Sequence, residues 1–395
     1  WPVFSARRSE DIINQTGDRK AMKIKDFGVE MWMNAYENDC TYNLAETCVE
    51  SLTVEQLLEL GGCREQAVAD ILGMKLTYGA IEGSPRLRML IAGLYEKQTP
   101  ENVITAHGAI GANHLVIEAL AGPGDEVVSV LPTYQQHYSI PEALGAEVHI
   151  LPLRSGNVFL PDLDELRGMV NKNTKLICIN NPNNPTGALM EREFLQEVAG
   201  IARSVDAWLL CDEVYRGLNH EGEPFTASVA DLYEKGISTG SMSKTFSLAG
   251  LRLGWIAGPK ALLEQVSRHR DYSTISCGMI DEYLAGIALE HKEAVIARNR
   301  AIVTGNLAVL ERWLKGQPKL SFVKPRAGTT AFLKMEFDMP SADFCRGLLA
   351  EKGVLLVPGS VMDREGYLRI GYANTPEVIA AGLDKMGEYL AELPL

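Results

Sequence analysis

One lysine stands in a run of small hydroxyl residues near the middle of the chain. Lys244 is flanked by Ser241, Ser243 and Thr245, and Arg252 follows eight positions later. Short hydroxyl donors and a planar guanidinium suit the oxygens of a phosphate group. A lysine amine attacks a carbonyl once a neighbouring cation or desolvation has lowered its pKa. The run therefore predicts a Schiff-base lysine beside a phosphate site, and the alternative is a solvated loop lysine.

Asp212 is a candidate partner for the ring nitrogen of a pyridine aldehyde. It ends an apolar stretch, residues 208–211. A carboxylate beside the ring nitrogen of a pyridine aldehyde keeps that nitrogen protonated, so the ring accepts electrons from a substrate α-carbon. Tyr215 and Asn184 are candidate hydrogen-bond donors to a ring hydroxyl, and Tyr134 offers a face on which the ring stacks. The alternative for Asp212 is a turn or helix-capping aspartate.

Two further stretches would bind anions. Arg369, in the strand-like stretch 367–372, presents a fork for an α-carboxylate, although a solitary strand arginine is commonly a surface residue. Residues 108–113 follow a short strand at 103–105 and lead into a helix predicted over 110–121. The N-terminus of a helix holds an anion with its backbone N–H groups. An ordinary strand-to-helix turn is the alternative for this glycine-containing run.

The segment 28–50 is both acidic and aromatic. Its acids and aromatic residues are Glu30, Trp32, Tyr36, Glu37, Asp39, Tyr42, Glu46 and Glu50. An acidic stretch is commonly a solvated face, but aromatic residues among the acids also suit recognition of a cation. Glu30 is our candidate for binding a substrate side chain.

The elements that carry these residues alternate along the chain. Stretches rich in Val, Ile and Leu, separated mostly by helical stretches, lie at 126–131, 147–153, 175–180, 207–211 and 237–240. This alternation predicts an α/β fold with a mostly parallel sheet covered by helices on both faces. Ligands of such sheets bind at the carboxyl ends of the strands, where Tyr134, Asn184, Asp212 and Lys244 all fall.

The length of 395 residues exceeds a single average core, so two domains are expected. A long helical region at 279–314 leads into strand and helix stretches at 330–337, 342–352, 353–358, 367–372 and 376–390. We predict four parts. They are a leader or cloning remnant at 1–21, an N-terminal segment at 22–65 that packs with the small domain and forms a lip of the active site, a large cofactor-binding domain at 66–300, and a small α+β domain at 301–395.

Composition excludes several classes of function. The net charge of −13 argues against nucleic acid as the main partner, because binding phosphate backbones needs clustered positive charge. No apolar run approaches the roughly 18 residues that a membrane span requires. The seven cysteines are scattered without a Cys-x-x-Cys pair, which is typical of reduced thiols in a cytoplasmic protein and weighs against a metal site.

Four motifs occur together in one order and spacing: Asn183-Asn184-Pro185-Thr186-Gly187, Asp212-x-x-Tyr215, Ser241-x-Ser243-Lys244, and Arg369. In these residues the chain resembles the pyridoxal-phosphate enzymes of fold type I, in the class I/II aminotransferase branch, over about residues 40 to 390. The resemblance implies the fold of these enzymes, with a seven-stranded type of sheet in the large domain. It also implies pyridoxal 5'-phosphate as the cofactor and an amino acid, a small molecule, as the substrate.

The resemblance implies a role for each matching position. Lys244 carries the cofactor as an internal aldimine and shuttles the proton, while Asp212 pairs with the pyridinium. Tyr215 and Asn184 contact the ring oxygen, and Tyr134 stacks on the ring. The phosphate is held by Ser241, Ser243, Arg252 and the backbone of Gly108, Ala109 and Ile110.

Two matches concern the substrate and the assembly. Arg369 takes the substrate carboxylate. Tyr78 matches the position that reaches the phosphate of the neighbouring subunit, which implies a homodimer with shared sites.

Departures from the family pattern leave the reaction open. Ala327-Gly328-Thr329-Thr330 stands where many members carry paired glycines, and no arginine is evident for a distal acid. The segment 30–50 instead resembles the capreomycidine-synthase branch, whose members cyclise a hydroxylated arginine by losing water. We therefore expect an aminotransferase acting at the α-carbon of an L-amino acid. The alternatives are elimination with cyclisation of a hydroxylated arginine, and a non-catalytic module with the same fold.

Overall fold

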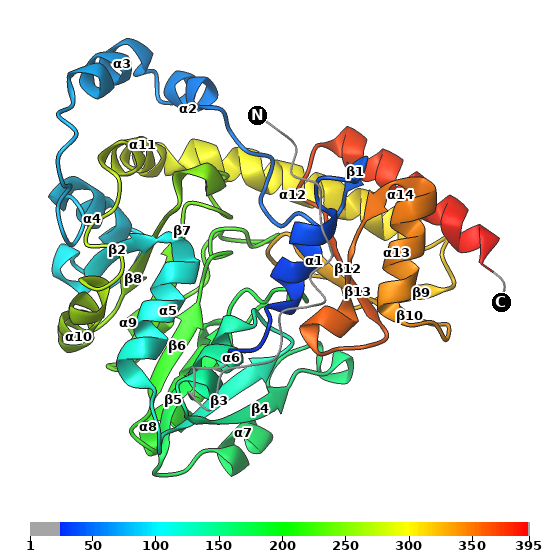
Figure 1. Cartoon of the computed structure of the whole chain (residues 1–395), viewed down its shortest axis with the longest axis horizontal. Helices are drawn as coiled ribbons and strands as arrows, with labels where there is room; N and C mark the ends of the chain where they lie inside the picture. The colour runs from blue at the N-terminus through cyan, green and yellow to red at the C-terminus, as the bar shows by residue number, and fades with distance from the viewer. Residues whose placement is uncertain (1–23, 394–395) are drawn as a thin grey trace, which may run out of the picture.

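A computed structural model describes residues 24–393. Its centre is a seven-stranded sheet in the order β2-β8-β7-β6-β5-β3-β4 (Figure 1). The strands are β2 (Val103–His107), β3 (Glu126–Leu131), β4 (Glu147–Pro152), β5 (Thr174–Asn180), β6 (Trp208–Asp212), β7 (Gly236–Ser241) and β8 (Leu253–Ala257). Neighbours are parallel except β8, which is antiparallel to both β2 and β7. The predicted mostly parallel sheet is confirmed.

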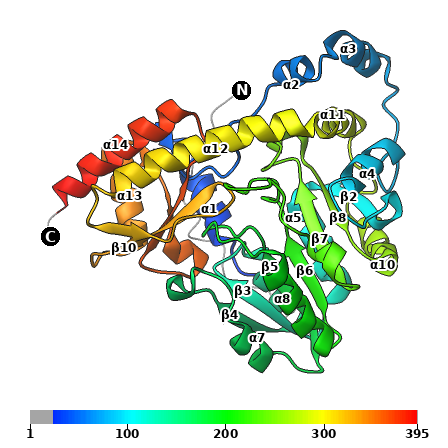
Figure 2. The same cartoon turned by 180° about the vertical axis from the view of Figure 1, so that it is seen from behind.

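Helices cover both faces of this sheet. In β5, Ile177 and Ile179 pack in one apolar cluster with α8 (Arg192–Ser204). Leu176 and Cys178 pack in another with α5 (Gly108–Leu120). Figure 1 shows α5 on the near face, and Figure 2 shows α8 on the near face of the reverse view. Since successive strand residues point to opposite faces, a strand that is apolar at every position is buried on both sides.

The remaining helices around the sheet complete these layers. They are α4 (Pro85–Ala92), α6 (Gln136–Ala143), α7 (Leu163–Met169), α9 (Val229–Leu232) and α10 (Lys260–Arg270). None of the helices within 24–393 has the length and apolar character needed to cross a membrane.

The C-terminal part forms a four-stranded antiparallel sheet in the order β12-β13-β10-β9. Its elements are β9 (Leu320–Phe322), β10 (Thr330–Met335), α13 (Ser341–Lys352), β12 (Val357–Pro358), β13 (Tyr367–Gly371) and α14 (Pro376–Glu392). The helical region before it divides at His291 into α11 (Met279–Glu290) and α12 (Lys292–Leu314). In Figure 1, α12 runs from α11 to the side of α14.

The prediction of one strand at 353–358 is wrong. β11 (Val354–Leu355) pairs in parallel with β1 (Tyr42–Asn43), whereas β12 joins the four-stranded sheet. The carbonyl of Leu356, between the two strands, accepts a hydrogen bond of 2.8 Å from Trp32 Nε1. Leu356 therefore bonds to the N-terminal segment, and the two strands on either side of it pair in different sheets.

The N-terminal segment divides between two neighbours. α1 (Gly28–Tyr36) lies against β12, and the backbone N–H of Gly28 donates to Gln135 Oε1 at 2.8 Å (Figure 1). α2 (Val54–Leu60) and α3 (Arg64–Gly73) follow, and α2 packs on α11 instead. The predicted boundary at residue 300 falls inside α12, so the division into domains stays a prediction. The stretch 1–21 lies outside the described residues.

Candidate active site

A cavity of about 310 Å³ opens at the carboxyl ends of β3, β5, β6 and β7. Of the residues predicted from sequence, it is lined by Glu30, Ala109, Ile110, Tyr134, Asn184, Asp212, Tyr215, Ser241, Ser243, Lys244, Arg252 and Arg369. Gly108 lies behind the Arg252 guanidinium. Tyr78 does not line the cavity: it sits between α3 and α4 and is 76% exposed. The structure thus gathers side chains from the whole length of the chain at one edge of the sheet.

One end of the cavity is built to receive an anion. Gly108 begins α5 with φ +66°, and a side chain at Gly254 of β8 would collide with its backbone. Ser241 and Ser243 face the same end, where the Ser243 N–H donates to Ser241 Oγ at 3.3 Å. β8 runs antiparallel, so its first residues, next to Arg252, also lie at this edge. A helix N-terminus, two hydroxyls and a guanidinium suit a phosphate group.

Asp212 is held by a buried hydrogen-bond network. Its Oδ2 accepts from Asn113 Nδ2 at 2.8 Å, and Asn113 Oδ1 accepts from Thr239 Oγ1 at 2.6 Å. Its Oδ1 accepts from the Val214 N–H at 3.1 Å. Burial raises the pKa of Asp212, while these donors and Lys244 oppose the rise. The carboxylate is therefore fixed in place, and a cationic ring nitrogen beside it would favour its charged form.

His137 stands 4.0 Å from Asp212, measured from Nε2 to Oδ2. It is fully buried, and burial lowers its pKa to about 4. His137 is therefore neutral at ordinary pH, and its Nε2 has no hydrogen-bond partner in the described structure.

Tyr215 presents a buried hydroxyl to the cavity. It is 2% exposed, and its Oη has no hydrogen-bond partner among residues 24–393. Leaving a buried hydroxyl unpaired costs about 1–3 kcal/mol, so a ligand oxygen is the natural partner. Asn184 lies on the same wall, held through its N–H by Asn180 Oδ1 at 2.6 Å. Both residues are thus placed as predicted, within one cavity.

Lys244 approaches the N-terminal segment rather than the sheet. Its Nζ donates to Thr47 Oγ1 at 2.6 Å and to Cys48 Sγ at 3.2 Å. Burial lowers the pKa of Lys244, but the nearby Cys48, Tyr215 and Glu46 outweigh burial and leave this pKa raised. These neighbours, Cys48 foremost, favour the ammonium form of Lys244 and contradict the expectation of a lowered pKa.

Arg369 lies buried with spare donors. It is 3% exposed, its Nη2 donates to the Ala45 carbonyl at 3.1 Å, and its Nη1 lies 3.5 Å from Asn184 Oδ1. Its Nε has no partner in the described part of the chain. A buried cation that meets only neutral oxygens is costly, so this position suits a bound carboxylate.

Three acids also line the cavity. Glu30 Oε1 accepts a hydrogen bond of 2.7 Å from Tyr134 Oη, and burial together with Glu30 raises the pKa of that tyrosine. Glu37 and Glu46 line the same cavity. The acids predicted as a solvated face or a cation-binding lip thus include three that reach the site.

Sequence reasoning missed four residues that contact the predicted set: Thr47, Cys48, Asn113 and His137. Asn113 carried a local signal, since it lies in the first helical turns after the glycine run. The others carried none, because their neighbours in the site lie far away along the chain.

Two other regions of the molecule contain clustered charged side chains but none of the predicted site residues. A larger groove of about 1130 Å³ contains none of the predicted residues, and ion pairs such as Arg326 with Glu191 and Arg192 with Glu96 already occupy its charges. Its two lysines, Lys292 and Lys324, pair with Glu293 and Glu311. Its size alone does not indicate a catalytic role.

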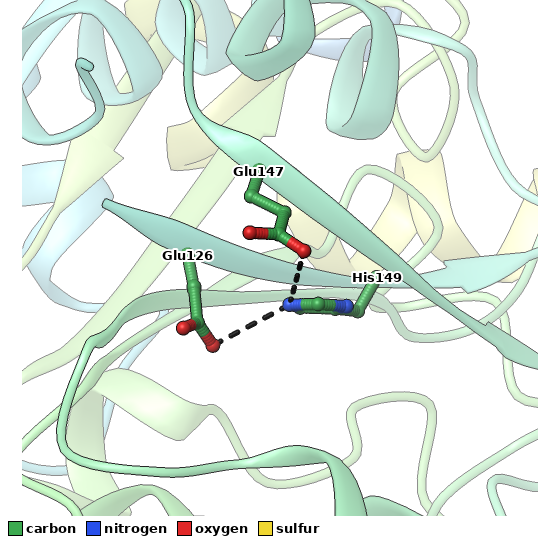
Figure 3. A group of neighbouring side chains, drawn as sticks. All are labelled: Glu126, Glu147 and His149. Atoms are coloured by element: carbon green, nitrogen blue, oxygen red, sulfur yellow. Dashed lines mark ion pairs between the residues drawn. The ribbon is translucent and has the colours of Figure 1, made fainter. Parts of the chain in front are cut away.

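The second region is a group on the edge of the sheet with the spacing of metal ligands: Glu126, Glu147 and His149 (Figure 3). His149 Nε2 lies 3.4 Å from Glu126 and 3.8 Å from Glu147. Asn171 Nδ2 also donates to Glu126 at 2.6 Å. Glu126 and His149 are partly buried and Glu147 is exposed, and the group is held by these contacts and by Asn171. The expectation of no metal stays a prediction.

Comparison with known proteins identifies the family. The family model for aminotransferase class I and II matches residues 33–385. Capreomycidine synthase from Streptomyces vinaceus is 35% identical over 309 residues, covering 78% of this chain and 79% of that protein. A crystal structure of a PLP-dependent aminotransferase from Streptococcus suis matches with a TM-score of 0.92 and 43% identity, covering 94% and 99% of the two chains. The PLP-dependent cyclase OrfR matches at 0.86 with 26% identity, covering 97% and 99%.

The residues present fit pyridoxal 5'-phosphate. The unpartnered Tyr215 hydroxyl, the fixed Asp212 carboxylate and the glycine-lined helix N-terminus match the ring oxygen, the ring nitrogen and the phosphate. Lys244 provides the amine in the same cavity. The chain belongs to the class I and II aminotransferases, enzymes of fold type I that use pyridoxal 5'-phosphate.

Proposed function

We propose that this enzyme is an aminotransferase acting at the α-carbon of an L-amino acid with a basic side chain. One observation carries the proposal: the buried Arg369 and the acids Glu30, Glu37 and Glu46 line a single cavity. Arg369 suits the α-carboxylate of the substrate through charge-assisted hydrogen bonds. The acids in the same cavity suit a cationic side chain on that molecule.

The chain's own residues supply positioning and proton transfer. When bound, the cofactor offers an aldehyde for amines and a ring that takes up the electron pair of the α-carbon. Asp212 holds the proton on the ring nitrogen, and Tyr215 donates to the ring oxygen. Arg369 fixes the α-carboxylate, so that Lys244 can remove the α-proton and return it at a neighbouring atom.

A second reaction is favoured by a specific observation, the 35% identity with capreomycidine synthase. In this reaction a hydroxylated arginine would lose water and close to a cyclic guanidine. The same α-proton removal would begin it, so the groups around Lys244 serve both reactions. A binding module without catalysis is disfavoured, because Lys244, Asp212 and Arg369 have no use together in a scaffold.

Product analysis tests the proposal. The purified enzyme is incubated with a panel of L-amino acids, including arginine, lysine and hydroxyarginines, with and without pyruvate or 2-oxoglutarate. We expect turnover of a basic amino acid that requires the keto acid. Turnover without any keto acid, with release of water, would instead establish the cyclisation. No turnover by an enzyme that carries its cofactor would favour the binding module.

We also propose a homodimer in which Tyr78 reaches the phosphate of the neighbouring subunit. Large exposed apolar side chains support this. Leu72 at the end of α3, Leu76 and Ile81 on the connection that carries Tyr78, and Tyr272 on the connection between α10 and α11 are 82%, 76%, 47% and 96% exposed. Light scattering should give twice the chain mass. Tyr78→Phe should weaken retention of the cofactor without dissociating the dimer.

A cytoplasmic location completes the proposal. All seven cysteines are free in the structure, as expected for a reducing compartment. Fractionation of cells producing the untagged protein tests this.

A further inference from the structure

The Lys244 amine has two partners in the N-terminal segment that no recognised role explains. Thr47 Oγ1 lies 2.6 Å and Cys48 Sγ 3.2 Å from its Nζ, and both residues line the cavity. They lie almost two hundred positions before the lysine, on the stretch that follows β1. These contacts link Lys244, the proposed proton-transferring group, to the N-terminal segment at the edge of the cavity.

The stretch that carries these partners is itself held firmly. Glu46 Oε1 accepts the backbone N–H groups of Thr47 and Cys48, each at 2.7 Å. The Thr47 carbonyl accepts from Thr329 Oγ1 at 2.8 Å. Because both its own carboxylate and the small domain fix this backbone, the hydroxyl and the thiol meet Lys244 at set positions.

The two contacts restrict the orientation of the Lys244 amine. A free lysine amine has three positions besides its carbon, and Thr47 and Cys48 occupy two of them as acceptors. The third position, a lone pair in the neutral amine and a proton in the charged one, is left for the cavity. Burial raises the pKa of the Cys48 thiol, and the charge of Lys244 opposes that rise.

We propose that Thr47 and Cys48 form a docking site for the Lys244 amine in the part of the catalytic cycle when it is not joined to the cofactor. They are positioning residues, and they direct the third position of the nitrogen toward the substrate α-carbon. No bond is made or broken at either residue. The inference rests on the proposed function only in taking Lys244 as the proton-transferring group.

The first test needs no substrate. Aminooxyacetate is added to the holoenzyme, where it takes up the cofactor's aldehyde and leaves the Lys244 amine free in the folded, loaded protein. Acetylation of Lys244 by a small amine-reactive reagent is then followed by peptide mass spectrometry as a function of pH. The variants are Thr47→Val, Thr47→Ser and Cys48→Ala, with Cys40→Ala as a matched control, because the Cys40 thiol contacts the Glu37 carbonyl instead.

Acceptors stabilise the ammonium form, so losing one should lower the pH midpoint of acetylation. We expect a fall of about one pH unit in Thr47→Val and in Cys48→Ala. Thr47→Ser and Cys40→Ala should keep the wild-type midpoint. Unchanged midpoints in both Thr47→Val and Cys48→Ala, or an equal shift in Cys40→Ala, would overturn the proposal. Cys48→Ala keeps the test decisive should Thr47→Val fail to fold.

A second test uses whichever amino acid the enzyme turns over, with deuterium at its α-carbon. Thr47→Val should lower kcat about tenfold with KM unchanged and should increase the isotope effect, since proton transfer becomes the slower step. Thr47→Ser should restore both values. An unchanged isotope effect in Thr47→Val would contradict the docking role. If the proposed reaction itself is wrong, the acetylation midpoints still decide the matter.

Discussion

The two walls of the cavity are built in different ways. The sheet wall, with Asp212 and Ser241, stands on strand ends whose relative positions the β-ladder fixes. The closing wall, with Arg369 and Lys244's partner Thr47, depends on contacts between opposite ends of the chain, such as Arg369 with the Ala45 carbonyl. From this difference we infer that the sheet wall serves the cofactor common to the family, whereas the closing wall selects the substrate.

The largest effect should come from the sheet wall. Asp212→Asn keeps the shape but removes the negative charge, and its single amide oxygen keeps only one of the two hydrogen bonds that Asn113 and Val214 donate to the carboxylate. The ring nitrogen then loses the group that keeps it protonated. We expect kcat to fall on the order of 10²–10³-fold, with little change in KM. Steady-state kinetics and the absorbance of the bound cofactor measure this.

Asp231→Asn is the matched control for this change. Asp231 is equally buried, but it accepts the backbone N–H groups of Glu96 and Lys97, away from the cavity. It should cost stability and leave the cofactor's absorbance alone. Similar kinetic losses in both variants would mean that Asp212 acts only through folding.

Arg369→Lys probes the closing wall. Lysine keeps the charge but loses the fork, so one of two charge-assisted hydrogen bonds to the α-carboxylate is lost. We expect KM for the amino acid to rise about 10- to 100-fold. Cofactor affinity, measured by absorbance titration, should stay as in the wild type. Arg300→Lys, at an arginine that binds the Asn219 carbonyl, serves as the control. Weakened cofactor binding in Arg369→Lys would contradict the assignment of substrate binding to the closing wall and cofactor binding to the sheet wall.

The sheet wall could be predicted from sequence, and the closing wall only in part. Asp212, Asn184 and Lys244 each follow an apolar strand, so alternation of strands and helices places them together before any coordinates are known. Arg369 is a candidate from its guanidinium in a strand-like stretch, and the family resemblance supports it. Nothing near Thr47 or Cys48 indicates that they meet residue 244, since that contact depends on how β1 pairs with β11. Helix α1 was not predicted either, because its acid and aromatic residues resembled a solvated stretch.

Glu30→Gln tests how the closing wall chooses a side chain. Glutamine can still accept the hydrogen bond from Tyr134, but the negative charge is gone. We expect kcat/KM for a basic amino acid to fall about five- to tenfold, and for a neutral straight-chain amino acid to change little. The ratio of the two values in wild type and variant is the measurement. An equal loss for both amino acids would assign Glu30 to positioning Tyr134 alone.

The smallest effect concerns His137, the buried neighbour of Asp212. Burial lowers the pKa of His137 from its ordinary 6.5 to about 4, so the unfolded chain takes up this proton before the folded one. Its contribution to stability is complete above pH 6.5 and is lost as the pH falls toward 4. Between pH 7.5 and 6 the wild type should therefore lose about 1 kcal/mol of unfolding free energy that His137→Asn does not lose. Urea unfolding at fixed protein concentration measures this. Exposed His114→Asn is the control, and a wild-type loss that persists unchanged in His137→Asn would show that the acid sensitivity arises elsewhere.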